Sequence, residues 1–267
     1  MRRHFERAGR LVSYLEVEPA AAAGRGTLVL VHAFPLAAEM WEPQLAAPPE
    51  GWRVVAPDLA GFGRSFPAPA SATFEDDAGD LLALLDHLGE KQAVVAGLSM
   101  GGYVAFALLR LAPERVRGLV LADTRPDADS PEARRSRQDM LNTLDRDGVE
   151  AVVEGMLPRL LGATTLETRP GVAARVREIG RRQRTEGIRA AIHRLMGRPD
   201  STPLLPAIRC PALVVAGAQD AITGPDIARG MQREIPGARL ALLESAGHLS
   251  NLEQPDAFNA ALGEFLS

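Results

Sequence analysis

The chain has 267 residues, of which 46% are hydrophobic and 24% charged, and its formal net charge is −4. This length and composition predict a globular protein with one large core and argue against a disordered chain. Because the net charge is not positive, nucleic acid and anionic membranes are poor candidate partners, and we expect a small-molecule ligand.

Cysteine usage and the first residues set the expected compartment. The single cysteine, Cys210, excludes an internal disulfide framework and a multi-cysteine metal site. The first 18 residues include basic side chains but neither an apolar run nor a small-residue cleavage site, so we expect no signal peptide and a cytoplasmic location. Lys91 is the sole lysine while arginine and alanine abound, which suggests a bacterial source with a GC-rich genome.

Short apolar runs rich in Val and Leu predict the strands. Each run is nearly continuous rather than alternating, which is typical of a parallel sheet covered on both faces. The Ala/Gly stretch 20–26 predicts a hairpin loop before the first of them. The runs are "TLVLVHA" (27–33), "WRVVAPD" (52–58), "QAVVAGL" (92–98), "VRGLVLAD" (116–123), "PALVVAGA" (211–218) and "ARLALLE" (238–244).

Helical patterns separate these runs. Thr73 followed by Asp76 predicts an N-terminal cap, after which leucines recur at helical spacing up to Gly89. A second helix follows the third run and stops before Pro113. Strand and helix alternate, so the sequence predicts a doubly wound, mostly parallel α/β sheet.

The alternation stops after Asp123 and resumes after about Pro203. Between them the sequence offers only amphipathic helices, which predicts a helical cap at 124–203 inserted into an α/β core formed by 1–123 and 204–267. Residues 124–200 carry 15 arginines against 12 acidic residues. We interpret those arginines as a solvated helix face rather than an anion site.

The segment Gly97-Leu98-Ser99-Met100-Gly101 fits the pattern G-x-S-x-G between a predicted strand and a predicted helix. Such a sharp turn strains the central residue, and its neighbours must be very small for the turn to clear them. Ser99 Oγ would then be exposed at the positive end of the helix, where the Met100 N–H could stabilise an oxyanion. On this motif alone, a Gly/Ser turn without chemistry remains an alternative.

A serine hydroxyl is a weak nucleophile, so it needs a base, and the base needs an orienting acid. His248 follows the last predicted strand and Asp220 follows the one before it. Both therefore lie at strand ends, where ligands bind in open α/β sheets, and the order Ser99, Asp220, His248 suits such a sheet. Asp123, at the end of an earlier strand, competes with Asp220 for the role of acid.

Five segments occur in the order found in the α/β-hydrolase fold family, which the chain resembles over essentially its whole length. The resemblance implies an α/β-hydrolase fold in which the Phe34 and Met100 backbone N–H groups form the oxyanion hole and His32 supports the loop before Phe34. Ala33 stands where glycine is usual, and a positive φ there would strain alanine. The segments are "HAFP" (32–35), "DLAGFGRS" (58–65), "GLSMGG" (97–102), "GAQD" (217–220) and "AGHLSNLEQP" (246–255).

The resemblance implies a serine hydrolase with Ser99, His248 and Asp220 as its catalytic residues. Such an enzyme would act on a small carboxylic ester or lactone through an acyl-serine. Within the family, the chain is most similar to the 3-oxoadipate enol-lactonase and small carboxylesterase branch. No metal or nucleotide motif is present, so we expect no cofactor and no metal. Met140, Met156, Leu157 and Met196 could line the substrate pocket, although their helical spacing is also that of plain core.

Other functions use the same residues. A cofactor-free perhydrolase or haloperoxidase and a C–C bond hydrolase share the proposed catalytic residues, and a ligand-sensing receptor can share the fold. The sequence does not determine the acyl or alcohol specificity, nor does it decide between a monomer and a homo-oligomer.

Overall fold

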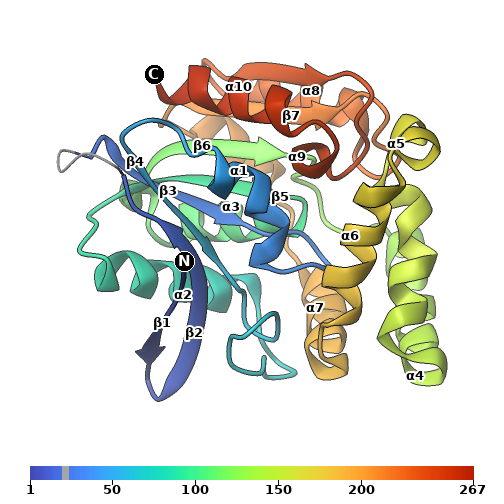
Figure 1. Cartoon of the computed structure of the whole chain (residues 1–267). Helices are drawn as coiled ribbons and strands as arrows, with labels where there is room; N and C mark the ends of the chain where they lie inside the picture. The colour runs from blue at the N-terminus through green and yellow to red at the C-terminus, as the bar shows by residue number, and fades with distance from the viewer. Residues whose placement is uncertain (20–23) are drawn as a thin grey trace.

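The computed structural model describes residues 1–19 and 24–267, whose arrangement Figure 1 shows. In this part of the chain eight strands form one sheet in the order β1-β2-β4-β3-β5-β6-β7-β8. Strand β2 is antiparallel to β1 and β4, and the remaining neighbours are parallel. The strands are β1 (Arg2–Arg7), β2 (Arg10–Val17), β3 (Gly26–Val31), β4 (Trp52–Pro57), β5 (Ala93–Leu98), β6 (Val116–Ala122), β7 (Ala212–Gly217) and β8 (Arg239–Leu243).

Helices cover both faces of the sheet, which is why the central strands are buried almost without interruption. Side chains of α2, α3 and α8 pack in one core cluster, and those of η1 and α10 pack in another. The predicted α/β fold class is confirmed, and all six predicted strands lie within two residues of their predicted bounds. The helices outside the predicted cap are η1 (Ala38–Trp41), α1 (Glu42–Ala46), α2 (Phe74–His87), α3 (Met100–Leu111), η2 (Pro113–Arg115), α8 (Gly224–Glu234), α9 (Ser250–Glu253) and α10 (Pro255–Leu266).

Strands β1 and β2 were not predicted. They form an antiparallel hairpin at one edge of the sheet, in which Phe5 pairs with Val12. Most side chains of β1 are charged, and only Phe5 in that strand is buried. An edge strand needs few apolar contacts, so its sequence lacks the apolar run by which the other strands are recognised. Of the predicted loop 20–26, residues 20–23 lie outside the described part of the chain.

The helix α2 begins as its sequence predicts. The Thr73 hydroxyl accepts a hydrogen bond from the Asp76 N–H, and the Asp76 carboxylate accepts one from the Thr73 N–H, so both ends of a capping box are present. Helix α3 ends at Leu111, two residues before Pro113.

The chain between β6 and β7 forms helices that stand together beyond the carboxyl ends of the strands (Figure 1). Residues 124–203 are all described and contain no strand. That they form a separate cap domain with these boundaries stays a prediction. Gly148, with a φ of 83°, divides the first of these helices into two parts that meet at a kink. They are α4 (Pro131–Leu160), α5 (Ala163–Thr168), α6 (Pro170–Arg181), α7 (Thr185–Gly197) and η3 (Thr202–Ala207).

Helix α7 is tightly joined to the core. A β-carbon on Gly187 would lie 2.0 Å from the carbonyl oxygen of Gly61, so the two backbones touch with no room for a side chain. Nearby, the fully buried Arg194 guanidinium makes hydrogen bonds of 2.7 and 2.8 Å to the two carboxylate oxygens of Asp77 in α2. Arg198 is also buried, and it pairs with Asp129. The interpretation of the arginines as a solvated face is therefore wrong for Arg194 and Arg198.

Among the described residues, no helix combines the length and the apolar character needed to cross a bilayer.

Candidate active site

Ser99 lies on a strained turn between β5 and α3. Its φ of 54° and ψ of −111° are unusual for a residue with a side chain. The flanking glycines leave no space: a β-carbon on Gly97 would lie 2.2 Å from the carbonyl oxygen of Gly101, and one on Gly101 would lie 2.1 Å from that of Val31. Contacts with nearby backbone therefore explain why both flanking positions of the G-x-S-x-G pattern are glycine.

The same turn is tied to the neighbouring strand. The Ser99 N–H donates to the carbonyl oxygen of Ala122 at 2.9 Å, and the Thr124 hydroxyl donates to the Ser99 carbonyl oxygen at 2.8 Å. Gly102 makes this contact possible, since a β-carbon there would lie 2.4 Å from Thr124 Oγ1. These bonds hold the strained serine in place.

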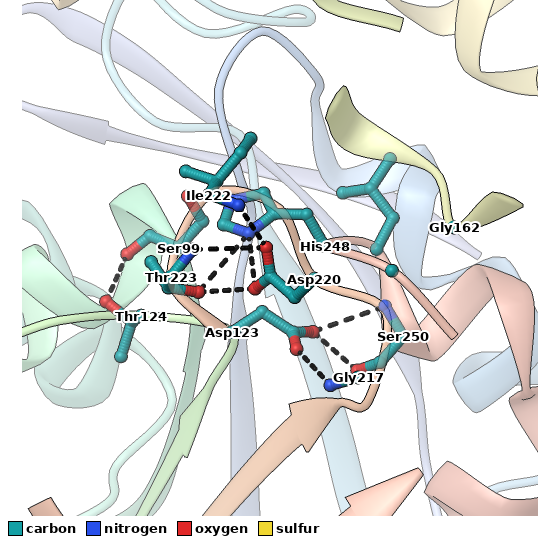
Figure 2. Close-up of polar contacts among 12 residues, drawn as sticks. Ser99, Asp123, Thr124, Gly162, Gly217, Asp220, Ile222, Thr223, His248 and Ser250 are labelled. Carbon is teal, nitrogen blue, oxygen red and sulfur yellow. Dashed lines mark hydrogen bonds and ion pairs between the residues drawn. The ribbon is translucent and has the colours of Figure 1, made fainter. Parts of the chain in front are cut away.

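The structure brings Ser99, His248 and Asp220 together from three loops (Figure 2). Ser99 Oγ is 2.8 Å from His248 Nε2, and His248 Nδ1 is 2.9 Å from Asp220 Oδ2. His248 and Asp220 are buried, with exposed fractions of 2% and 7%. When Nδ1 carries the proton and donates to Asp220, Nε2 is free to accept the proton of the Ser99 hydroxyl.

Asp220 is held as an ionised carboxylate by its surroundings. Its Oδ1 accepts the Ile222 N–H at 2.7 Å and the Thr223 N–H at 3.1 Å, and its Oδ2 accepts the Thr223 hydroxyl as well as His248 (Figure 2). Burial by itself would raise the pKa of Asp220, but the His248 charge and these hydrogen bonds outweigh burial and lower the pKa to about 2.

Asp123, the competing candidate for the acid, does not contact His248 in the described structure. It lies directly after β6 with a φ of 44°. Its Oδ1 accepts the Gly217 N–H at 2.9 Å, and its Oδ2 accepts the N–H and hydroxyl of Ser250 (Figure 2). Burial, and then the charge of Asp220, raise the pKa of Asp123 well above its usual range. Asp123 therefore connects β6 to the loops after β7 and β8 instead of orienting the imidazole.

Glu253 is a functional candidate that the sequence analysis missed. Its fully buried carboxylate accepts the N–H groups of Gly247 at 2.9 Å and Leu249 at 3.2 Å, the two residues that flank His248. Its other oxygen accepts the Gly162 N–H at 2.7 Å, between α4 and α5. The signal available in the sequence was an acidic residue only five positions after His248, in the segment "HLSNLEQP".

Of the two expected oxyanion donors, Met100 follows Ser99 in the chain and Phe34 lines the same cavity. Met100 is the first residue of α3, so its N–H has no partner within the helix. The Phe34 N–H donates to no acceptor among the described residues, and Phe34 and Ser99 line the same cavity. Ala33 does not have a positive φ, so the strain considered for alanine at this position is absent.

His32 supports this loop from beneath. Its Nε2 accepts the Leu59 N–H at 3.0 Å, and its Nδ1 donates to the Ala33 carbonyl oxygen at 3.0 Å. Burial lowers the pKa of His32 to about 4 against the raising effect of Ala33 and Asp58, which keeps the ring neutral. Asp58 anchors the next turn by accepting the N–H groups of Ala38 and Arg64.

Ser99 and His248 open into a cavity of about 510 Å³, a volume suited to a small ligand. Met140 and Met156 line this cavity, as considered from the sequence, whereas Leu157 and Met196 pack into the core. No group of three or more His, Cys, Asp or Glu side chains within residues 1–19 and 24–267 is arranged to hold a metal ion. Further apolar lining comes from Phe34, Val152, Leu195 and Ile222, and the polar lining includes Tyr103 and four arginines.

Comparisons with known proteins agree with this architecture. The family described as alpha/beta hydrolase fold matches residues 26–255. The 3-oxoadipate enol-lactonase 2 of Acinetobacter baylyi is 29% identical over 240 residues, which cover 90% of this chain and 88% of that protein.

Two solved structures are similar over nearly their whole lengths. A thermophilic esterase from Thermogutta terrifontis, solved with malate bound, has 38% identity and a TM-score of 0.92, with 100% of this chain and 98% of that one covered. The enol-lactonase from Burkholderia xenovorans LB400 has 30% identity and a TM-score of 0.90, with 99% of each chain covered. The chain therefore belongs to the α/β-hydrolase fold family, as a hydrolase related to esterases and enol-lactonases.

Proposed function

We propose that the chain is a serine hydrolase that cleaves a small carboxylic ester or lactone through an acyl-serine intermediate. The observation that carries the proposal is the continuous path from Ser99 Oγ through the His248 imidazole to the Asp220 carboxylate, at the wall of a cavity of about 510 Å³. The kinship with esterases and enol-lactonases supports the same class of substrate.

In the first half of the reaction, Ser99 Oγ attacks the substrate carbonyl while His248 Nε2 takes its proton. Asp220 stabilises the imidazolium that forms, and the N–H groups of Phe34 and Met100 donate to the oxyanion of the tetrahedral intermediate. The intermediate collapses when His248 returns the proton to the leaving alkoxide. An acyl-serine and an alcohol result; in a lactone, the alcohol stays attached to the acyl group.

In the second half, His248 takes a proton from water, and the hydroxide attacks the acyl-serine carbonyl. The second tetrahedral intermediate expels Ser99 Oγ, which recovers its proton from His248. The acid is released and the protein returns to its starting state without any cofactor.

Labelling with a fluorophosphonate probe, followed by a panel of short p-nitrophenyl esters and lactones, tests the proposal. We expect wild-type protein to be labelled and to turn over, and Ser99→Ala to lose labelling and at least about 10³-fold in kcat. Ser71→Ala, which changes a surface serine, is the matched control. If Ser99→Ala hydrolyses the esters as fast as wild type, the mechanism is wrong.

Further substrates tested beside this panel separate the other functions that share this geometry. Formation of peracid from acetate and hydrogen peroxide would identify a perhydrolase, and cleavage of a vinylogous diketone would identify a C–C bond hydrolase. A stoichiometric burst of product without further turnover would instead identify a ligand-sensing receptor.

A further inference from the structure

Part of the cavity wall is a basic cluster formed by Tyr103, Arg125, Arg137 and Arg198, all of which line the cavity that contains Ser99. The Arg198 guanidinium carbon lies 4.5 Å from the centroid of the Tyr103 ring. Arg198 and Tyr103 are buried, with exposed fractions of 5% and 7%. Burial raises the pKa of Tyr103, against the opposing charges of Arg198, Arg137 and Arg125, so its hydroxyl stays a hydrogen-bond donor.

The basic cluster has more positive than negative charge. Arg125 makes two hydrogen bonds to Asp127, and Arg198 pairs with Asp129. Arg137 has only a 3.3 Å contact from its Nε to the same Asp129 carboxylate. Three guanidinium groups thus share two carboxylates, which leaves one positive charge without a carboxylate of its own.

The other charged residues of the cavity wall do not cancel this excess. Glu132 pairs with Arg135 outside the wall, and Asp139 is exposed to solvent. Arg159 also lines the cavity, and it forms no ion pair with any described residue. Taken together with their partners, these groups leave the wall positive.

Arg137 is the member of the basic cluster with free donors. Neither of its terminal nitrogens donates to a described residue, and 20% of its side chain is exposed. The Tyr103 hydroxyl likewise makes no hydrogen bond within the described structure, although it lines the cavity. A guanidinium fork beside a phenol is a suitable pair of donors for a carboxylate.

We propose that Arg137 and Tyr103 bind a second, ionised carboxyl group of the substrate, so that half-esters of short dicarboxylic acids are preferred over neutral esters. The inference rests on the proposed function, because the basic cluster and Ser99 share one cavity. A carboxylate that enters a partly buried site needs such partners to replace its water.

Tyr103 also lies near the nucleophile along the chain. It follows Ser99 by four residues, about one turn of α3, and both residues line the cavity. A half-ester of a short diacid is therefore a suitable probe of the site.

The test compares two esters that differ only in charge. Monoethyl glutarate carries the carboxylate, and its terminal amide is a neutral analogue of the same shape. We expect wild type to have a higher kcat/KM for the half-ester, and Arg137→Gln to lower the ratio of the two kcat/KM values by about tenfold to a hundredfold. Arg134→Gln changes an exposed arginine of the same helix that neither lines the cavity nor forms an ion pair with a described residue, and it should leave the ratio as in wild type.

A second measurement does not depend on turnover of the half-ester. Glutarate should compete with a neutral p-nitrophenyl ester, and its inhibition constant should rise in Arg137→Gln and rise less in Arg137→Lys, which keeps the charge but loses the fork. An unchanged ratio together with an unchanged inhibition constant would overturn the proposal.

Failure of the carboxylate site is distinguishable from failure of the hydrolase mechanism. If wild type hydrolyses the neutral ester without preferring the half-ester, the mechanism stands and the site is wrong. If wild type hydrolyses neither ester, the mechanism is wrong. Calorimetric titration of wild type and Arg137→Gln with glutarate then still decides whether the carboxylate site exists, because binding to Arg137 does not require catalysis.

Discussion

Asp123 and Asp220 follow neighbouring strands of the sheet, yet only Asp220 reaches His248, with its Oδ2 at 2.9 Å from Nδ1. Asp123 accepts its hydrogen bonds from Gly217 and Ser250 instead. Two carboxylates at similar positions thus have separate tasks, one beside the imidazole and the other between loops.

Substituting each aspartate separately tests this division. Asp220→Asn should lower kcat by about 10³- to 10⁴-fold, because an amide can stabilise the wrong imidazole tautomer. Asp123→Asn should lower kcat by less than about tenfold. It should instead lower the melting temperature, because the amide leaves a buried donor poorly paired. Kinetics on a p-nitrophenyl ester and thermal unfolding measure the two effects. Equal losses of kcat in both variants would contradict the assignment.

The low pKa of Asp220 predicts how stability depends on pH. Its pKa of about 2 in the folded protein lies below the ordinary 3.8, so folding favours the ionised form. The resulting stabilisation, about 2 kcal/mol, is present above pH about 4 and is lost as the pH falls toward 2. Urea unfolding at pH values from 5 down to 2 should show that the difference in free energy of unfolding between wild type and Asp220→Asn becomes smaller. A difference that is constant with pH would contradict the prediction.

Glu253 is predicted to position His248. Glu253→Gln replaces one accepting oxygen by an amide nitrogen, so either the Gly162 N–H or the N–H groups of Gly247 and Leu249 lose their acceptor. We expect a loss of about 1 to 3 kcal/mol in stability and a fall in kcat that exceeds any change in KM. Thermal unfolding and steady-state kinetics well below the melting temperature provide the readout. Glu264→Gln, an exposed residue of α10, is the control, and a stable Glu253→Gln with wild-type kcat would refute the role.

The buried pair of Asp77 and Arg194 should respond asymmetrically to mutation. Asp77→Ala leaves an arginine that cannot lose its charge, at a cost of about 3 to 5 kcal/mol. Arg194→Met should cost less, because burial already raises the pKa of Asp77 to about 7 despite Arg194, and the carboxyl can take up a proton.

Free energies of unfolding from urea titration give the two costs, and the Asp77→Ala/Arg194→Met double variant completes the cycle. Asp145→Ala, which breaks a solvent-exposed ion pair with Arg189, should leave the free energy of unfolding nearly unchanged. If Arg194→Met proves the more damaging change, the explanation from burial and protonation is wrong.

The apolar runs were sufficient to predict the central sheet, because strands buried on both faces are apolar at nearly every position. The helix cap at Thr73 was sufficient to predict the start of α2. The turn at Ser99 was equally visible, since its glycines are required by contacts with nearby backbone. The β1–β2 hairpin could not be predicted from the sequence, because an edge strand tolerates charged side chains and so lacks an apolar run.

The basic cluster could not be predicted from helical periodicity, which does not show which arginines meet in the folded chain. Arg137 and Arg198 are 61 residues apart by their numbering and meet only because α4 and the end of α7 pack around Tyr103. An arginine on an amphipathic helix looks the same in sequence whether it faces water or another helix. The partner, and with it the difference between a solvated and a buried charge, is known only from the packing of the helices.

The contact between Gly61 and Gly187 has a practical consequence for protein engineering. It fixes the backbone of α7 against the core, and α7 carries Leu195 to the cavity wall. A mutant library intended to broaden the range of accepted substrates should therefore spare α7 and randomise the exposed positions of α4. There, larger or smaller side chains can reshape the entrance without breaking a backbone contact that only glycine permits.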